Sequence, residues 1–239
     1  MSVRHKLDRL RAELARDDLD RAGRWLRVAE LSLAAARLSP LVGVGHGRIY
    51  ELVTPPRPFR GLRDFIVRRA GPGDTAALVE LDRAPRALVA ARLERGDLAY
   101  VGELAGKTIA HAWFHRGPEP FDEDLPLFPR WGLPADAFWS YHAVTLPEAR
   151  ASGVFVKVFH VALRELFVEH GAARVRCRVT ASNAPAIALH ERTGFRCLGT
   201  VVALAAPGVR WMSWHGDGGA WRRIGRRDRA VVSLPSEAA

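Results

Sequence analysis

The segment from residue 138 to residue 180 constrains the fold more than any other part of the chain. Residues 138–145 and 174–180 have the pattern of strands, and residues 154–170 between them have apolar side chains at helical spacing. Gly171 is a typical helix stop. A helix that joins two strands of one sheet makes a right-handed βαβ unit with parallel strands. We therefore expect an α/β protein, in which Cys177 is a core residue and not a nucleophile.

Strands and helices alternate with turns through the rest of residues 61–215. Strands are expected at 65–69, 98–104, 108–114, 195–204 and 209–214. One helix is expected to follow Asp74, which is well placed to cap it, and two others span 85–94 and 184–192. The tight turn around Gly106-Lys107 is typical of a hairpin. Residues 117–136 are expected to form a loop, which is either a substrate-binding segment or a packed connector.

The chain divides into three regions by composition. Residues 1–60 are expected to form an N-terminal helical extension and linker: amphipathic helices over 2–38, a short strand at 48–54, and a stiff segment with prolines at 55, 56 and 58. The helices could cover the core, form a dimer contact or lie on a membrane surface, and packing on the protein itself is favoured. Residues 61–215 form the main domain, and residues 216–239 a basic tail.

The net charge of +10 raises the question of nucleic-acid binding. Only three residues are lysines, and the arginines are spread over every segment, which is typical of a compositional bias, so a nucleic-acid partner is not expected. The positive surface would still concentrate an anionic ligand. The two cysteines have no metal-ligand spacing, and no secretory signal or membrane-spanning stretch is present, so we expect a cytoplasmic protein without a structural metal.

The segment V-T-L-P-E-A-R-A-S-G-V-F, residues 144–155, places a strand end, a turn and a helix start in sequence. Backbone N–H groups at a helix N-terminus point outward, and the helix dipole adds positive potential there. Residues 151–155 can therefore hold a pyrophosphate without a lysine, and Gly153 permits a close approach. An ordinary tight connection between a strand and a helix would have the same pattern.

Two motifs in order make the chain resemble the GNAT superfamily of N-acetyltransferases. Arg150, Gly153 and Phe155 follow its R/Q-x-x-G-x-G/A loop, except that a phenylalanine replaces the last small residue, and Asn183 to Phe195 follow its N-x-x-A-x-x-L-Y-x-x-x-G-F block. The resemblance covers residues 62–215. It implies a central mixed sheet flanked by helices, with acetyl-CoA or another acyl-CoA as co-substrate and no metal.

The resemblance also implies where the cofactor binds. In such proteins the two strands before these motifs splay apart, and the pantetheine arm lies between them. The residues that it assigns to cofactor binding are Val144, Thr145, Arg150, Ala151, Ser152, Gly153, Val154, Phe155 and Asn183.

The predicted catalytic residues are histidines. His190 stands where the family often has a tyrosine that protonates the leaving thiolate, although a solvent-facing helix histidine would have the same spacing. The amine acceptor needs a general base near the end of the strand at Val144. Tyr141 and His142 are the nearest candidates; strand alternation puts them on opposite faces unless a bulge intervenes, and we favour His142. His111, His115 and Glu103 on the neighbouring hairpin could serve instead through water.

The predicted activity is direct transfer of an acyl group, most simply acetyl, from acyl-CoA to a primary amine. One alternative is a long-chain or carrier-protein donor, which the bulky side chain of Phe155 in the loop would favour. Another is a catalytically silent module whose basic tail contacts nucleic acid or anionic lipid. The sequence does not name the acceptor, and a homodimer is possible.

Overall fold

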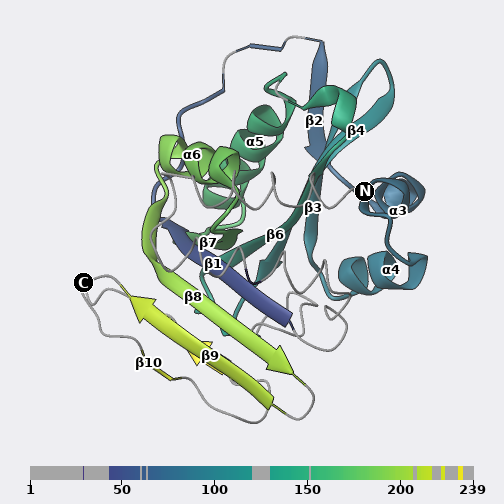
Figure 1. Ribbon diagram of the computed structural model, residues 1–239. Coiled ribbons are helices and arrows are strands. Elements are labelled where there is room, and N and C mark those ends of the chain that lie inside the picture. The colour runs from purple at the N-terminus through teal and green to yellow at the C-terminus, as the bar shows by residue number, and fades with distance from the viewer. Residues whose placement is uncertain are drawn as a thin grey trace, which may run out of the picture.

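The computed structural model describes residues 29, 43–59, 61–62, 64–119, 130–150, 152–206, 209–216, 222–223 and 231–233. A nine-stranded sheet forms its centre, in the order β10-β9-β8-β1-β7-β6-β4-β3-β2 (Figure 1). Its strands are β1 (Gly43–Leu52), β2 (Phe65–Arg69), β3 (Leu98–Leu104), β4 (Lys107–Arg116), β6 (Ala137–Thr145), β7 (Arg174–Thr180), β8 (Arg196–Ala206), β9 (Val209–Gly216) and β10 (Arg222–Arg223). β6 and β7 pair in parallel, and the other pairs recorded in this sheet are antiparallel. The expected α/β fold with a mixed sheet is confirmed.

The helices cover the two faces of the sheet in pairs. α5 (Val154–Val168) and α6 (Ala184–Thr193) lie on one face, and α3 (Thr75–Asp82) and α4 (Arg86–Glu94) lie on the other (Figure 1). Short 3-10 turns precede α3 and α5, at Pro72–Asp74 and Pro147–Ala149. Among the described residues no helix is long and apolar enough to cross a lipid bilayer.

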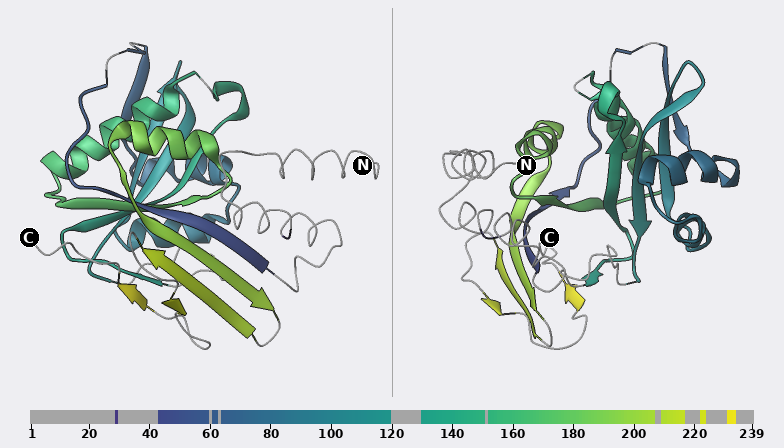
Figure 2. Two further views of the ribbon diagram at one scale, coloured as in Figure 1. Left: turned by 60° about the vertical axis from the view of Figure 1, so that its left-hand side comes forward. Right: turned by 45° about the vertical axis from the view of Figure 1, so that its right-hand side comes forward.

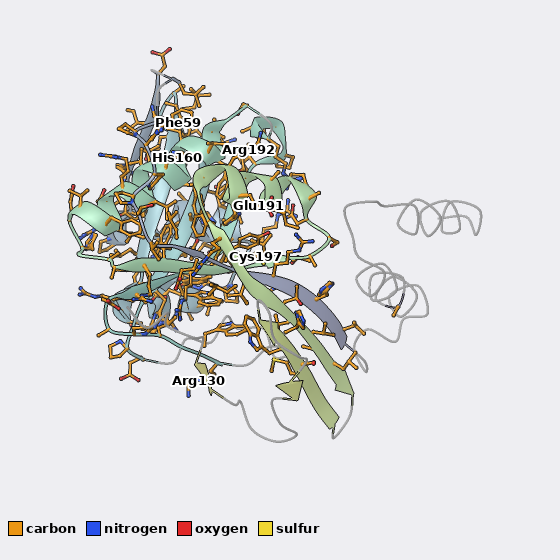
Figure 3. All side chains as sticks on the ribbon, turned by 90° about the vertical axis from the view of Figure 1, so that its left-hand side faces the viewer. Phe59, Arg130, His160, Glu191, Arg192 and Cys197 are labelled. Atoms are coloured by element: carbon orange, nitrogen blue, oxygen red, sulfur yellow. The ribbon has the colours of Figure 1, made fainter. Side chains whose placement is uncertain are left out.

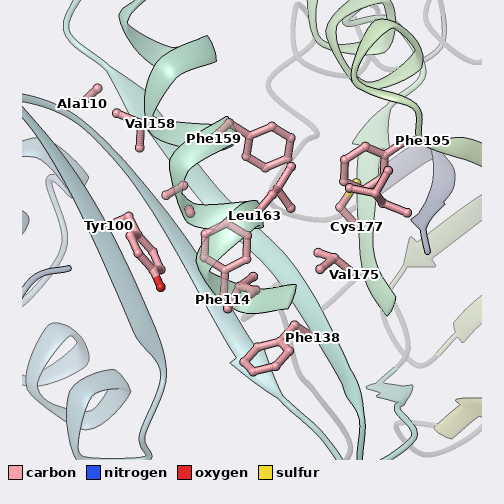
Figure 4. Packing of buried hydrophobic residues seen from close by; sticks show 14 of the residues in the cluster. Tyr100, Ala110, Phe114, Phe138, Val158, Phe159, Leu163, Val175, Cys177 and Phe195 are labelled. Atoms are coloured by element: carbon pink, nitrogen blue, oxygen red, sulfur yellow. The ribbon is translucent and has the colours of Figure 1, made fainter. Parts of the chain in front are cut away.

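Each face of the sheet has its own hydrophobic core, because alternate side chains of a strand point to opposite faces. The core beneath α5 and α6 contains Phe114, Phe138, Phe159, Cys177 and Phe195, and Figure 4 shows these side chains packed against α5. Cys177 is buried there, as expected. The core beneath α3 and α4 is built around three fully buried tryptophans, at positions 113, 131 and 139.

β1 lies inside the sheet, between β7 and β8 and antiparallel to both. The expected strand at 48–54 therefore exists, but it begins at Gly43 and joins residues of the main domain. β8, β9 and the start of β1 extend beyond the helices (Figure 2). A domain boundary near residue 60 stays a prediction, although residues 43–52 share a sheet with residues 65–216.

The proline-rich segment 53–59 is the first part of the connection from β1 to β2, which lies at the far edge of the sheet, and this segment passes over α5. Arg164 of α5 donates a hydrogen bond to the carbonyl oxygen of Pro56 at 3.0 Å. The ring of Phe59 contacts His160 edge-on at 5.9 Å, and Figure 3 labels both residues. The stiff linker is thus a strap that is fixed to the helix it crosses.

Three local predictions need correction. The tight turn of the β3–β4 hairpin consists of Ala105 and Gly106, one residue before the expected position, and both have positive φ. Asp74 does not cap α3 with its side chain; its carboxylate pairs with Arg68 at 2.7 Å instead. The expected loop 117–136 contains a short strand, β5 (Arg130–Gly132), which pairs in parallel with β11 (Val231–Ser233). The helices expected at 2–38 lie outside the described residues, apart from Ala29.

Candidate active site

The two parallel strands β6 and β7 pair only over their first halves. Their register runs from Ala137 opposite Arg174 to Ser140 opposite Cys177. Beyond this point β6 continues to Thr145 on β4, and β7 continues to Thr180 on β1. We call the region in which the two strands no longer pair the β6–β7 fork. The splayed strands that the sequence resemblance implies are therefore present.

A β-bulge interrupts β6 just beyond the last residue that pairs with β7. His111 of β4 faces Val144 and Trp113 faces Tyr141, so one residue on β4 is opposed by two on β6, His142 and Ala143. His142 has φ of 43°, in the left-handed region that non-glycine residues rarely adopt. The bulge places the side chains of Tyr141 and His142 on the same face of the sheet, where both meet groups carried by α3, α4 or the segment after α4.

His142 faces a buried carboxylate at the end of α3. Its Nδ1 atom lies 3.2 Å from Oδ1 of Asp82, and the same oxygen lies 2.5 Å from Nε2 of His111. The Asp82 and His111 side chains are fully buried, whereas 35% of the His142 side chain is exposed. The two imidazole rings stack at 6.0 Å with 27° between their planes. Arg92 donates a hydrogen bond at 2.9 Å to the other carboxylate oxygen of Asp82.

The charge state of this cluster follows from its burial. Burial tends to raise the pKa of the Asp82 carboxyl group, but the contacts with His111 and His142 outweigh burial and hold the pKa well below its usual range. Burial lowers the pKa of His111, and Asp82 only partly opposes this shift. An ion pair with Asp82 would instead raise the pKa of the histidine. We therefore assign an ionised Asp82 and a neutral His111.

A second buried carboxylate lies on the same face. Asp97 accepts hydrogen bonds from the Tyr141 hydroxyl and from Arg95, and its Oδ1 atom lies 2.7 Å from Nδ1 of His115. Burial, with the charge of Asp97, raises the pKa of Tyr141 far above its usual range. Tyr141, the other candidate base, is therefore held as a neutral phenol that donates a hydrogen bond to Asp97.

The loop and helix start that were expected to bind the cofactor lie next to the end of β6. Gly153 begins α5 with φ of 85°, and Arg150 donates a hydrogen bond to the carbonyl oxygen of Thr145 at 3.3 Å. Ser152 is exposed, and its hydroxyl donates to the carbonyl oxygen of Ala149. Val144 and Thr145 are half-buried at the end of β6, and Ala151 lies outside the described residues.

The Phe155 side chain turns toward the core beneath α5. Its ring stacks on Phe159 at 5.5 Å with 19° between the planes, so the side chain lies along the core beneath α5. Val154 is buried in the same core. The bulky residue that replaces a small one in the motif is therefore accommodated by packing in the core.

The second motif forms the start of α6. Asn183 is the N-cap: its side-chain oxygen accepts a hydrogen bond from the N–H group of Ala186 at 3.2 Å. His190 is buried beneath α6, where its ring contacts Phe159, Phe195 and Tyr50, and its Nδ1 atom bonds to the carbonyl oxygen of Ala186 at 2.7 Å. Burial lowers the pKa of His190.

The structure brings together only part of the predicted site. Residues 142–145, Arg150 and residues 152–155 lie at one end of β6 and the start of α5, but His142 and His190 belong to opposite faces of the sheet. Sequence reasoning missed Asp82, although a signal exists. Asp82 lies one helical turn after the buried Leu78, so it is a carboxylate on the apolar face of an amphipathic helix.

Comparisons with known proteins identify the fold. No model of a protein family matches the sequence, and no curated protein is significantly similar to it. Solved structures do match. A protein from Novosphingobium aromaticivorans DSM 12444, described as a GNAT-family acetyltransferase, has a TM-score of 0.51 at 20% identity, covering 70% of this chain and 68% of the other. GCN5-related N-acetyltransferases from Kribbella flavida and Sphaerobacter thermophilus have TM-scores of 0.52 and 0.50 at 14% and 18% identity.

Both of these N-acetyltransferases match over 74% of this chain, but over only 64% and 57% of their own lengths. The alignments with all three proteins therefore span about two thirds of their lengths or less. At such identities the likeness is one of fold.

Proposed function

Because the chain has the GNAT fold, we propose that it is an N-acyltransferase that moves an acetyl group from acetyl-CoA to a primary amine. The observation that carries this proposal is the position of His142. This half-exposed histidine lies in a bulge immediately beyond the last paired residues of β6 and β7, with a buried carboxylate behind it. Strained backbone conformations of this kind are concentrated at functional sites.

Acetyl-CoA would bind in the β6–β7 fork. Its pyrophosphate would accept hydrogen bonds from the N–H groups at the start of α5, where the helix dipole favours negative charge. Its pantetheine arm would pair with backbone groups of residues 141–145, which β7 leaves free. The oxygen of Asn183 is used by the helix cap, so its amide N–H₂ group would contact the arm.

His142 would act as the general base. Its Nδ1 atom faces Asp82, so Nε2 is the nitrogen that remains for the acceptor amine. The amine gives a proton to Nε2 as its nitrogen attacks the thioester carbonyl. A C–N bond forms, the C–S bond then breaks, and coenzyme A leaves as a thiolate. Asp82 is the positioning residue, because its charge stabilises the imidazolium that forms.

His190 was assigned the protonation of the thiolate, and this role stays a prediction that its surroundings do not favour. Burial lowers its pKa, so the imidazolium is scarce at neutral pH, and its Nδ1 atom is engaged by Ala186. Because a thiol has a pKa of about 8.5, its thiolate is a stable leaving group that can take its proton from water. We therefore assign the essential proton transfer to His142.

The test is release of coenzyme A thiol from acetyl-CoA by the full chain, measured with a panel of small amines, amino sugars and peptide N-termini. His142→Asn removes the imidazole but keeps a residue type that tolerates the left-handed backbone of the bulge. We expect kcat/KM to fall by about 100-fold or more, the range of general-base catalysis. His170→Gln, just beyond the C-terminal end of α5, is the matched control and should retain activity.

The same assay decides between the proposal and its alternatives. Thiol release only with long-chain acyl-CoA would select the long-chain donor. No release with any acyl-CoA, together with salt-dependent binding of nucleic acid, would select the silent module and contradict an enzyme. A cytoplasmic location, a homodimer and a separate N-terminal helical region are parts of the proposal that need fractionation, light scattering and truncation, respectively.

A further inference from the structure

The cluster of Asp82, His111 and His142 contains buried polar atoms for which the described residues provide no hydrogen bond. Oδ1 of Asp82 and both ring nitrogens of His111 are buried, and among the residues that the structure describes they have no hydrogen-bond partner of acceptable geometry. Oδ1 lies only 2.5 Å from Nε2 of His111, so the two atoms are in contact without the alignment of a hydrogen bond. Buried polar groups without a partner are rare and require an explanation, such as a bound ion.

From this geometry we propose that Asp82, His111 and His142 form a binding site for one divalent transition-metal cation. The potential ligand atoms of the three side chains all lie within 4.8 Å of one another. Two imidazole nitrogens and one carboxylate oxygen suit zinc and its first-row neighbours. This site goes beyond the sequence analysis, in which no metal-ligand spacing was visible, because the three residues come from three separate elements.

The two distances that involve Asp82 require only a small adjustment, and the two histidine nitrogens, which lie within 4.8 Å of each other, would have to approach. Ligand atoms at about 2.0–2.1 Å from a tetrahedral zinc ion are about 3.3 Å apart. The His142–Asp82 pair is already at 3.2 Å, and the His111–Asp82 pair at 2.5 Å has to open by less than about 1 Å. Arg92 binds the other oxygen of Asp82, so the carboxylate coordinates through Oδ1 alone and is held in orientation, as ligands in metal sites commonly are.

The proposed site has an open side. Asp82 and His111 are buried, whereas the exposed His142 marks the direction from which an ion and water can enter. Three protein ligands with a free coordination position are typical of exchangeable or catalytic sites and not of closed structural ones.

The metal and the general base exclude each other, and this part rests on the proposed function. A cation on Nδ1 of His142 leaves the proton of the neutral ring on Nε2, so the ring has no lone pair for the acceptor amine. Zinc should therefore inhibit acyl transfer, and a chelator should restore it.

Metal binding is tested without reference to activity. Full-length protein freed of metal by dialysis against a chelator is titrated with Zn²⁺ in competition with a chromophoric chelator, and Co²⁺ is added separately to record its visible absorption. We expect one ion per chain. His142→Asn and Asp82→Asn should each weaken binding by at least about 10-fold, as loss of one of three ligands requires. His170→Gln should bind like the wild type, and melting temperatures without metal verify that each variant is folded.

Two results would overturn the site: no bound zinc in the wild type, or equal affinity in the wild type and in folded His142→Asn. If the proposed acyltransferase activity is wrong, the metal-free wild-type protein should release no thiol although zinc still binds. If zinc binds at the site but does not reduce thiol release, the proposed inhibition of acyl transfer by zinc is wrong.

Discussion

The exposed side chain of Ser152, just before the start of α5, permits a test of the cofactor site by charge alone. Ser152→Glu places a carboxylate at the helix N-terminus, where a negative charge stabilises a helix by about 0.3–1 kcal/mol. The same carboxylate would repel the pyrophosphate of a bound acyl-CoA. For two phosphate charges at roughly 6 Å and an effective dielectric constant of about 60, Coulomb's law gives about 2 kcal/mol, or about 20-fold in Kd.

The matched control is Ser152→Gln, which has the same shape without the charge. Both variants lose the hydrogen bond of 2.6 Å from the Ser152 hydroxyl to Ala149, so their difference isolates electrostatics. In calorimetric titrations with acetyl-CoA, the glutamate variant should bind about 20-fold more weakly than the glutamine variant. Without ligand it should melt at the same temperature or higher. The difference in Kd should shrink in about 1 M salt, where the Debye length is about 3 Å. Equal affinities of the two variants at low salt would refute the placement of the pyrophosphate.

Three further substitutions test the packing around the site. Burial lowers the pKa of His190, so below about pH 6.5 this histidine is protonated in the unfolded chain but stays neutral in the folded chain. The free energy of unfolding therefore falls as the pH drops through that range. His190→Phe should reduce this acid-side fall in melting temperature, and an unchanged slope would contradict the shift. Gly102→Ala places a Cβ atom within 2.2 Å of the buried Phe65 ring. We therefore expect the free energy of unfolding, measured with denaturant, to fall by about 1–3 kcal/mol. An unchanged free energy would mean that the sheet and α5 adjust freely. Glu51→Ala removes the carboxylate that lies 2.7 Å from the fully buried Arg176. We expect the free energy of unfolding to fall by about 3–5 kcal/mol, in a single unfolding transition. A separate early transition of β1 would contradict its integration in the sheet.

Local patterns in the sequence predict most of the elements. The alternation of Val175, Cys177 and Val179 and the helical spacing over 154–170 determine β7 and α5 nearly to the residue. Such patterns show which side of an element is buried, and the periodicity of the apolar residues is visible within a short stretch of sequence. The parallel β6–β7 pair followed from the same reasoning, because a helix between two strands leaves little choice of topology.

The position of β1 could not be predicted in this way. Its pattern indicates a strand, but the choice of partners depends on contacts with β7 and β8, which lie more than 120 residues later. The prolines predicted a stiff linker, but its passage over α5 depends on the same long-range packing.

The centre of the candidate site was only half predictable. His142 stood out because of its place at a strand end, and the sequence analysis noted that a bulge would change its direction. The bulge depends on the register with β4, and the proximity of Asp82 depends on how α3 packs against the sheet. Both are long-range packing effects, so sequence spacing links neither Asp82 nor His111 to His142.

Hydrogen exchange of backbone amides with and without acetyl-CoA tests whether acetyl-CoA binds in the β6–β7 fork. We expect slower exchange over residues 141–145 of β6 and residues 152–156 at the start of α5, because bound acetyl-CoA would cover the first and accept hydrogen bonds from the second. Exchange in α3 and α4 should change little. No protection in either segment at a saturating concentration of acetyl-CoA, or protection confined to another face of the sheet, would contradict an acyl-CoA site in the β6–β7 fork.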